Sequence, residues 1–165
     1  MPDRGPRIYW DANVFLHDIE GTPASLPMLD AILHAARTTG RPTIDTSTVS
    51  IAEVAYHAEE KARLALDPAV QEALDALWAD RSAIQLVETT RLDTMAARDL
   101  QRWSIAQGWG GLKPMDAIHL ATARRMGATE FHTYEETKLN KYGPQIGCVV
   151  VQPYTAQPML PDLLP

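Results

Sequence analysis

Cysteine is almost absent from this sequence, and that scarcity excludes several classes of protein. Cys148 is the single cysteine among 165 residues, which rules out an intramolecular disulfide framework and a zinc cage built on cysteine. A chain of this length buries roughly 70% of the surface that its unfolded form exposes, so one compact domain needs no such cross-links. We therefore expect one soluble domain that functions in the cytoplasm.

The sequence also lacks a long apolar run. Its first eleven residues contain no stretch that fits the hydrophobic region of a signal peptide. The longest uncharged stretch, residues 142–161, has twenty residues, about the length of a membrane span. Four prolines interrupt it, and a continuous helix does not tolerate them. We therefore expect no membrane segment.

Several well-known active-site motifs are missing. The chain has no phosphate-binding glycine loop, no dinucleotide-binding glycine motif and no HExxH zinc motif, and neither a serine nor Cys148 lies in a nucleophile motif. The pairs Glu53/His57 and Asp116/His119 resemble half of a di-iron bundle site. The strand-rich pattern does not fit such a bundle, so His57 and His119 are expected to pack or to support a site.

Positive charge is scarce. Lys and Arg total 15 against 21 Asp and Glu, which gives a net charge of −6 and a pI near 5.3 and argues against a basic nucleic-acid coat protein. Residues 42–80 hold eight acids and two bases, a balance of −6, whereas residues 98–141 hold seven bases and five acids, a balance of +2. Two interpretations stay open: random scatter of solvated charge, or an acidic pocket beside a basic rim.

Short β-like runs alternate with longer helical patterns along the chain. Strands are predicted at residues 7–10, 42–45, 82–87, 129–133 and 147–151. Helices are predicted at residues 14–17, 27–39, 47–66, 68–79, 90–107 and 114–126. The alternation predicts a single α/β domain over residues 1–151 with a mainly parallel sheet. Residues 152–165 form a proline-rich tail that either covers a sheet edge or contacts a partner.

Four acidic residues fall just after predicted strands or in early turns of the helices that follow. Asp11 directly follows the first strand, and Glu53 lies on an apolar stripe of the helix predicted at 47–66. Asp116 lies in the first turn of a helix, and Glu135 follows a strand. Each position alone also fits a helix cap, a stripe edge or a solvated turn. Together they gather at one edge of a parallel sheet.

A cluster of carboxylates at that edge needs cations. Two carboxylates 4 Å apart repel each other by about 4 kcal/mol at an effective dielectric constant near 20. Residues 8–17 and 42–60 contain no Lys or Arg. A hard divalent ion is therefore the expected counter-charge, and ligands that are all oxygen suit Mg²⁺ or Mn²⁺.

Four sequence blocks resemble a known family. The blocks I-Y-W-D-A-N-V-F-L, S-T-V-S-I-A-E-V, K-P-M-D-A-I-H-L-A-T-A and F-H-T-Y-E-E occur in this order between residues 8 and 141. In this order and spacing they resemble the PIN-domain ribonucleases, and among those the VapC-type toxins of toxin–antitoxin pairs. The resemblance implies a doubly wound parallel sheet flanked by helices, metal-dependent cleavage of RNA, inhibition by a small antitoxin, and homodimer formation.

The resemblance also carries roles over to individual residues. It implies that the catalytic and metal-binding acids are Asp11, Glu53, Asp116 and Glu135. It implies that the small polar residues supporting them are Asn13, Ser47 and Thr133. The family usually has aspartate at the fourth acidic position, whereas here Glu135 stands beside Glu136, so the identity of the fourth acid and a one-metal or two-metal site stay open.

The predicted function is that of a Mg²⁺-dependent endoribonuclease, with Mn²⁺ as a substitute, and the toxin of a toxin–antitoxin pair. The ions would activate a water molecule and stabilise the charge that develops on the phosphate. The basic residues expected to bind RNA phosphates are Lys113, Arg124, Lys138 and Lys141, and Trp109 or Tyr134 would stack on an unpaired base. The alternative is a catalytically weak PIN-like module that binds RNA or a protein.

Overall fold

The computed structural model describes residues 6–155, so residues 156–165 of the predicted tail lie outside the described part. Five strands form one sheet in the order β3-β2-β1-β4-β5, and every neighbouring pair is parallel. The strands are β1 (Arg7–Trp10), β2 (Thr43–Ser47), β3 (Ile84–Val87), β4 (Glu130–His132) and β5 (Val149–Val151). The predicted parallel α/β sheet is confirmed, and each strand ends within about two residues of its predicted bounds.

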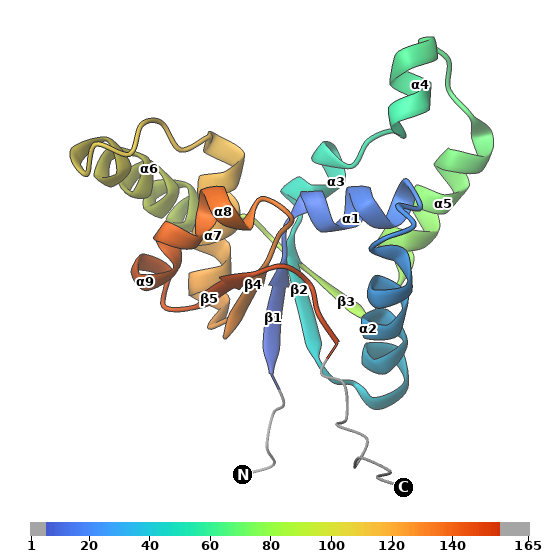
Figure 1. The fold of residues 1–165 in the computed structure, drawn as a ribbon, viewed down its shortest axis with the longest axis horizontal. Helices are drawn as coiled ribbons and strands as arrows, with labels where there is room; N and C mark the ends of the chain where they lie inside the picture. Colours follow the sequence, from blue (N-terminus) through green and yellow to red (C-terminus); the bar gives the residue numbers. More distant parts are fainter. Residues whose placement is uncertain (1–5, 156–165) are drawn as a thin grey trace, which may run out of the picture.

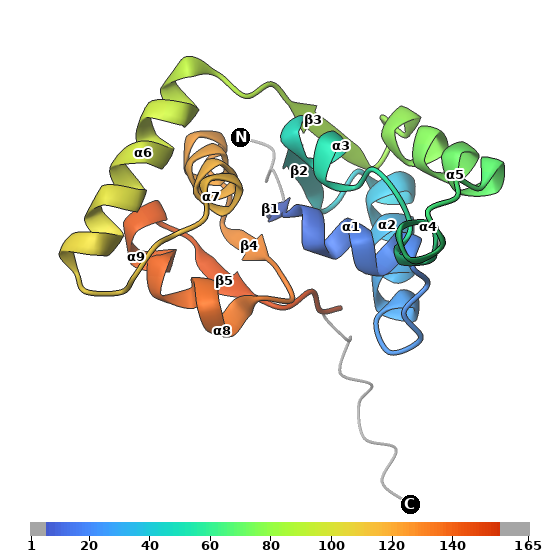
Figure 2. The ribbon, with the colours of Figure 1, turned by 90° about the horizontal axis from the view of Figure 1, so that it is seen from above.

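The sheet is doubly wound. From β1 the chain proceeds to β2 and β3, and it then returns to the other side of β1 for β4 and β5. The helices α1 (Ala12–Ile19), α2 (Leu26–Thr39) and α5 (Pro68–Ala79) lie to one side (Figures 1 and 2). The helices α6 (Arg91–Ala106), α7 (Pro114–Met126) and α9 (Gly143–Ile146) lie to the other. The winding reverses between β1 and β4, and open α/β sheets bind their ligands at such a reversal, beside the carboxyl ends of the strands.

Alternate side chains of the strands fill two separate cores. Ile8 and Trp10 belong to the core beneath α1, α2 and α5. Tyr9, Phe131 and Val150 belong to the core beneath α6, α7 and α9, where the rings of Tyr9 and Phe131 stack with their centroids 5.3 Å apart. This alternation follows from the two-residue period of a strand. Both faces of the sheet are therefore covered, as is usual for parallel sheets.

The single helix predicted over residues 47–66 is wrong. Ser47 is the last residue of β2, and the helical residues form two short segments, α3 (Val49–Glu53) and α4 (Ala58–Arg63). Val54 ends α3 because its side chain, 1% exposed, turns into the core beneath α1. The imidazole of His57 then accepts a hydrogen bond from the backbone N–H of Glu59 and starts α4. Burial of one valine and a new cap thus outweigh the continuous helical pattern.

Other helix boundaries agree with the sequence signals. Gly40 and Gly127 end α2 and α7 with φ of 68° and 67°, the left-handed conformation that favours glycine. Thr90 caps α6. Three short segments were not predicted: α8 (Glu136–Leu139), the 3₁₀ helix η1 (Asn140–Tyr142) and α9. Within residues 6–155, no helix combines the length and apolar character that a membrane crossing requires.

Candidate metal-binding cleft

An open cleft of about 600 Å³ lies where the two sides of the sheet meet, and the four predicted acids all line it. Asp11 begins α1 directly after β1, and Glu53 is the last residue of α3. Asp116 lies in the first turn of α7, and Glu135 precedes α8. Figure 2 shows these four helices around the centre of the sheet. The structure therefore brings together residues from four separate segments, as the sequence predicted.

Asp11 is the most buried of the four acids, with 6% of its surface exposed. Its carboxylate accepts a hydrogen bond of 3.2 Å from the backbone N–H of Val14, which caps α1. The Thr133 hydroxyl accepts a hydrogen bond from the backbone N–H of Glu135 at 3.0 Å and lies near enough to Asp11 to lower the pKa of its carboxyl group. Burial raises the pKa of Asp11 to about 6 against the lowering effect of Thr133, and the charge of Asp116 adds to the rise.

A buried hydrogen-bond chain orients Glu53. The backbone N–H of Ser47 donates to the Tyr9 hydroxyl at 2.9 Å, and this hydroxyl lies 2.8 Å from Nδ1 of His119. The carboxylate of Glu53 only accepts hydrogen bonds, so Nε2 of His119 donates to it at 2.6 Å. In the neutral imidazole Nδ1 is then the acceptor, and the Tyr9 hydroxyl donates to it. Because His119 and Tyr9 are both almost fully buried, this chain fixes the imidazole tautomer and the direction of the Glu53 side chain.

Lys138 pairs with two of the acids that line the cleft. Its ammonium group donates to Asp116 at 3.0 Å and to Glu135 at 3.2 Å. Burial alone would lower the pKa of Lys138, but the hydrogen bonds to Asp116 and Glu135 outweigh burial and raise it. Two of the four carboxylates are therefore already paired with a cation of the protein itself.

The residues fit a hard divalent cation in chemical kind, although their side chains are not gathered around one point. The acids and Asn13 supply oxygen donors, and the side-chain oxygen of Asn13 is buried without a hydrogen-bond partner beside the cleft. Among residues 6–155, no group of three or more His, Cys, Asp and Glu side chains is placed to hold a metal ion together. Two of the acids, Asp116 and Glu135, direct their carboxylates to the ammonium of Lys138 instead of to a common point in the cleft.

The predicted supporting and fourth-position residues differ in their contacts. Asn13 lines the cleft, and Thr133 contacts both Asp11 and Glu135. Ser47 lies further away and reaches Glu53 only through Tyr9 and His119; its hydroxyl pairs with that of Thr89 at 2.6 Å. Glu135 is among the residues that line the cleft, whereas Glu136 is not. Within the described residues, Glu135 is therefore the better fourth acid.

The structure brings only some of the predicted RNA-binding residues to the cleft. Lys113 lines its wall, whereas Lys138 is not a lining residue and reaches the site through ion pairs with Asp116 and Glu135. Arg124 is in the last turn of α7, roughly 12 Å along the helix axis from Asp116. The ammonium of Lys141 lies over the ring of Trp109, 5.3 Å from its centroid. Contacts of these four side chains with RNA stay predictions.

The aromatic residue at the cleft is one that the sequence did not single out. Tyr56 lines the cleft and is 44% exposed. Trp109 instead packs edge-on against Trp103, and Tyr134 stacks on His17 with centroids 3.9 Å apart. Sequence reasoning missed Tyr56 because the helix predicted across residues 47–66 placed it on a core-facing stripe. It also missed Tyr9, whose role depends on a contact across the sheet.

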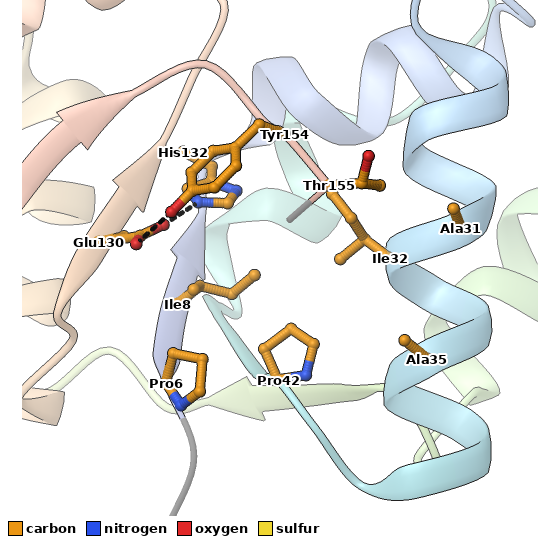
Figure 3. A pocket seen from close by; sticks show the side chains of 10 residues that line it. All are labelled: Pro6, Ile8, Ala31, Ile32, Ala35, Pro42, Glu130, His132, Tyr154 and Thr155. Carbon is orange, nitrogen blue, oxygen red and sulfur yellow. Dashed lines mark hydrogen bonds and ion pairs between the residues drawn. The ribbon is translucent and has the colours of Figure 1, made fainter. Parts of the chain in front are cut away.

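A second cavity, of about 350 Å³, lies at the opposite ends of β1 and β2 (Figure 3). Its apolar wall comes from α2 and the start of β1, including Ile8 and Ile32. At its polar end, His132 and Tyr154 converge on the carboxylate of Glu130, with distances of 2.8 and 2.7 Å. These polar groups pair with one another, and none of the four predicted acids lines this second cavity.

Comparison with known proteins places this sequence and fold in one family. The sequence of residues 8–143 matches the PIN domain. The chain therefore belongs to the PIN-domain family. Among curated proteins, none matches the sequence significantly.

Solved structures with the same fold include VapC20 from Mycobacterium tuberculosis, described as a Sarcin-Ricin loop cleaving toxin. Its TM-score is 0.60 at 15% identity, over 88% of this chain and 99% of that one. DNA-bound VapBC from Salmonella typhimurium has a TM-score of 0.63 at 15% identity, over 89% of this chain and 98% of that one. A toxin–antitoxin complex from Klebsiella pneumoniae has a TM-score of 0.57 at 20% identity, over 89% and 98%. These matches confirm the predicted PIN-like fold.

Proposed function

We propose that the protein is a divalent-cation-dependent endoribonuclease and the toxin of a toxin–antitoxin pair that acts in the cytoplasm. The observation that carries the proposal is the convergence of Asp11, Glu53, Asp116 and Glu135 on one open cleft at the winding reversal of a PIN fold. Such a concentration of carboxylates is costly unless a cation offsets it. A structural module that only binds a partner has no need of it.

Mg²⁺, with Mn²⁺ as a substitute, would be held by Asp11, Asp116 and the glutamates, and Asn13 supplies a further oxygen donor. When bound, a divalent cation supplies Lewis-acid activation of water and charge stabilisation at the phosphate. The backbone N–H of Val14 donates a hydrogen bond to the Asp11 carboxylate, and Thr133 lies beside it. Groups that are oriented before RNA binds lower the cost of reorganisation during the reaction.

Nε2 of His119 donates a hydrogen bond to the Glu53 carboxylate and holds it in one orientation. Because the Tyr9 hydroxyl donates to Nδ1, the imidazole cannot turn without breaking two buried hydrogen bonds. At the mouth of the cleft, Lys113 is placed to bind a phosphate and Tyr56 to stack on an unpaired base. These two side chains favour single-stranded or looped RNA over a regular duplex.

An antitoxin is the partner that we propose for this chain. Support comes from the solved structures with the same fold, which include VapBC from Salmonella typhimurium and a toxin–antitoxin complex from Klebsiella pneumoniae. Homodimer formation stays a prediction from the family resemblance.

The proposal is tested with purified wild type and the variant Asp116→Asn, incubated with single-stranded and hairpin RNA in Mg²⁺ or in EDTA. Of these two proteins, we expect only the wild type to cleave RNA, and only in Mg²⁺. The amide of Asp116→Asn cannot replace the ionic carboxylate ligand. Asp99→Asn is the matched control, since Asp99 is exposed and pairs with Arg98. Equal cleavage by wild type and Asp116→Asn would assign the activity to a contaminant.

A second candidate function is a module that binds RNA or a protein without cleaving. The observation that favours it is the pairing of Lys138 with two of the acids. Thermal unfolding in Mg²⁺ separates the two candidates, because a ligand that binds the folded state raises the unfolding temperature. A module without a cation site is not stabilised by Mg²⁺ relative to an equal ionic strength of NaCl.

A further inference from the structure

The ammonium of Lys138 stands where two of the cleft carboxylates meet. It lies 3.0 Å from an oxygen of Asp116 and 3.2 Å from an oxygen of Glu135. Lys138 is in α8, three residues after Glu135, so the helix itself directs the side chain back over that carboxylate. Asp116 belongs to another segment, the first turn of α7. One basic side chain thus joins two separate segments of the site.

Among residues 6–155, the other lysine at the cleft, Lys113, forms no ion pair with the acids. Asp11 is buried, and the hydrogen bond to its carboxylate comes from a neutral group, the backbone N–H of Val14. Glu53 accepts a hydrogen bond from His119, whose other ring nitrogen is taken by the neutral Tyr9 hydroxyl. Lys138 therefore provides the local positive charge that holds the Asp116 side of the cleft together.

A divalent cation needs those same oxygens. Mg²⁺ binds oxygen ligands at about 2.1 Å and requires near-octahedral geometry, and an ammonium 3 Å from the same carboxylates takes the same approach directions. The two cations also repel each other strongly at such short distances. A divalent cation and the ammonium of Lys138 therefore cannot bind Asp116 and Glu135 at the same time.

We propose that Lys138 is an internal counter-ion that competes with the divalent cation for Asp116 and Glu135 and must leave them when the cation binds. This inference rests on the proposed function, because it concerns the cation of that same site. The side chain of Lys138 is 38% exposed and carries its ammonium on a flexible four-carbon stem, so the released ammonium can turn toward solvent at the cleft. There it can bind an RNA phosphate, the role that the sequence predicted for it.

The test is a Mn²⁺ titration of full-length protein without RNA. Free Mn²⁺ is measured by electron paramagnetic resonance, and the unfolding temperature is recorded along the same titration. Lys138→Met keeps the length of the side chain and removes the charge, whereas Lys138→Arg keeps the charge. Arg98→Met is the matched control, because it removes one positive charge from an exposed pair with Asp99.

We expect Lys138→Met to bind Mn²⁺ at a concentration about tenfold lower than wild type, because a site that is blocked part of the time binds with reduced apparent affinity. Without Mn²⁺ the same variant should unfold at a lower temperature, since its carboxylates lose their counter-ion. Lys138→Arg and Arg98→Met should bind Mn²⁺ as the wild type does. If Lys138→Met does not fold, Lys138→Gln replaces it in the titration.

The proposed competition is overturned if wild type and Lys138→Met reach half-saturation at the same Mn²⁺ concentration, or if the variant binds Mn²⁺ more weakly. Failure of the proposed function gives a different result, because then neither the wild type nor Lys138→Met binds Mn²⁺, and the wild type does not cleave RNA. Failure of the competition alone leaves wild-type binding and cleavage intact. Binding by Lys138→Met but not by wild type supports the inference in its strongest form.

Discussion

The carboxylate of Asp93 accepts a hydrogen bond of 2.7 Å from the guanidinium of Arg125 and thereby joins the start of α6 to the end of α7. Asp93 is 1% exposed and also accepts hydrogen bonds from the backbone N–H and the hydroxyl of Thr90. Burial alone would raise the pKa of Asp93, but the hydrogen bonds from Arg125 and Thr90 outweigh it and lower the pKa. This contact fixes α7, the helix that carries Asp116 and His119.

Replacing Asp93 with asparagine should therefore reduce the free energy of unfolding by about 2 kcal/mol at pH 7, since a buried ion pair loses one partner. A carboxyl group with a lowered pKa in the folded state stabilises the protein above its unfolded pKa, and the contribution disappears as the pH falls through the folded pKa. The difference between wild type and Asp93→Asn should thus shrink below a pH of about 4. Urea unfolding at several pH values measures it.

The control for this prediction is Asp99→Asn, which removes an exposed ion pair with Arg98. It should change the free energy of unfolding by less than about 0.5 kcal/mol. If Asp99→Asn and Asp93→Asn had the same effect at pH 7, the Asp93–Arg125 contact would contribute no more than a surface pair.

The contribution of Asp11 to stability should depend on pH in the opposite direction to that of Asp93. Its pKa of about 6 lies above the usual 3.8 for aspartate, so the folded state holds its proton more tightly than the unfolded state does. The stability from this group is complete below a pH of about 4 and is lost as the pH rises to about 6. Asp11→Asn should therefore stabilise the metal-free protein by about 2 kcal/mol at pH 7 and have little effect at pH 4.

Asparagine still accepts the capping hydrogen bond of α1, so this comparison isolates the charge. Thermal or urea unfolding in EDTA at the two pH values is the measurement. Equal destabilisation at pH 4 and pH 7 would mean that the loss comes from packing or from the cap instead of from a buried charge. In RNA cleavage assays, the same variant should be inactive.

Tyr9→Phe should weaken the chain that orients Glu53. Removing the hydroxyl leaves the backbone N–H of Ser47 and Nδ1 of His119 without their partner, which should cost about 1–3 kcal/mol of stability. Cleavage of RNA should fall by about tenfold, because groups that orient a metal ligand typically matter to that extent. Initial rates at saturating Mg²⁺ measure this effect.

The matched control is Tyr142→Phe. It removes a buried hydroxyl that pairs with Ser104 at 2.7 Å, outside the cleft. We expect a comparable loss of stability with an unchanged cleavage rate. A parallel loss of cleavage in both variants would indicate that Tyr9 acts on activity only through general stability.

Gly143→Ala should destabilise the fold at the turn between η1 and α9. A Cβ atom at this position would lie 2.9 Å from the backbone oxygen of Cys148, so the backbone must shift. We expect a loss of about 1–3 kcal/mol in the free energy of unfolding. Gly111→Ala, where nothing lies within 4 Å of the added Cβ, should stay within about 0.5 kcal/mol of wild type. Chemical unfolding of both variants provides the test, and equal effects would contradict the steric explanation.

Local signals in the sequence were sufficient for most of the fold. Gly40, Pro114 and Gly127 mark helix ends through backbone preferences that do not depend on distant contacts. The break at Val54 could not be predicted in the same way. The break occurs where burying the Val54 side chain in the core stabilises the protein more than continuing the helix would. Tertiary packing sets that difference in free energy.

The sequence predicted that the four acids lie together and that Asn13 and Thr133 lie near them, but it could not predict the hydrogen bonds that orient the acids. Asp11 and Asp116 follow from their places after a strand and in a first helical turn. Glu53 was placed correctly for a wrong reason, since its neighbours Ala52 and Tyr56 are exposed instead of core-facing. The hydrogen bond from His119 to Glu53 joins residues 66 positions apart in the chain. A contact of that kind has no local sequence signal.

The separation of the two cores has a mechanical consequence for the acids. Asp11 and Glu53 are attached to elements that pack on one core, whereas Asp116 and Glu135 are attached to elements that pack on the other. The two pairs of carboxylates are thus carried by two different sets of packed side chains, and the hydrogen bond from His119 to Glu53 links these sets. A substitution that changes side-chain volume in one core should act first on the pair of acids attached to that core.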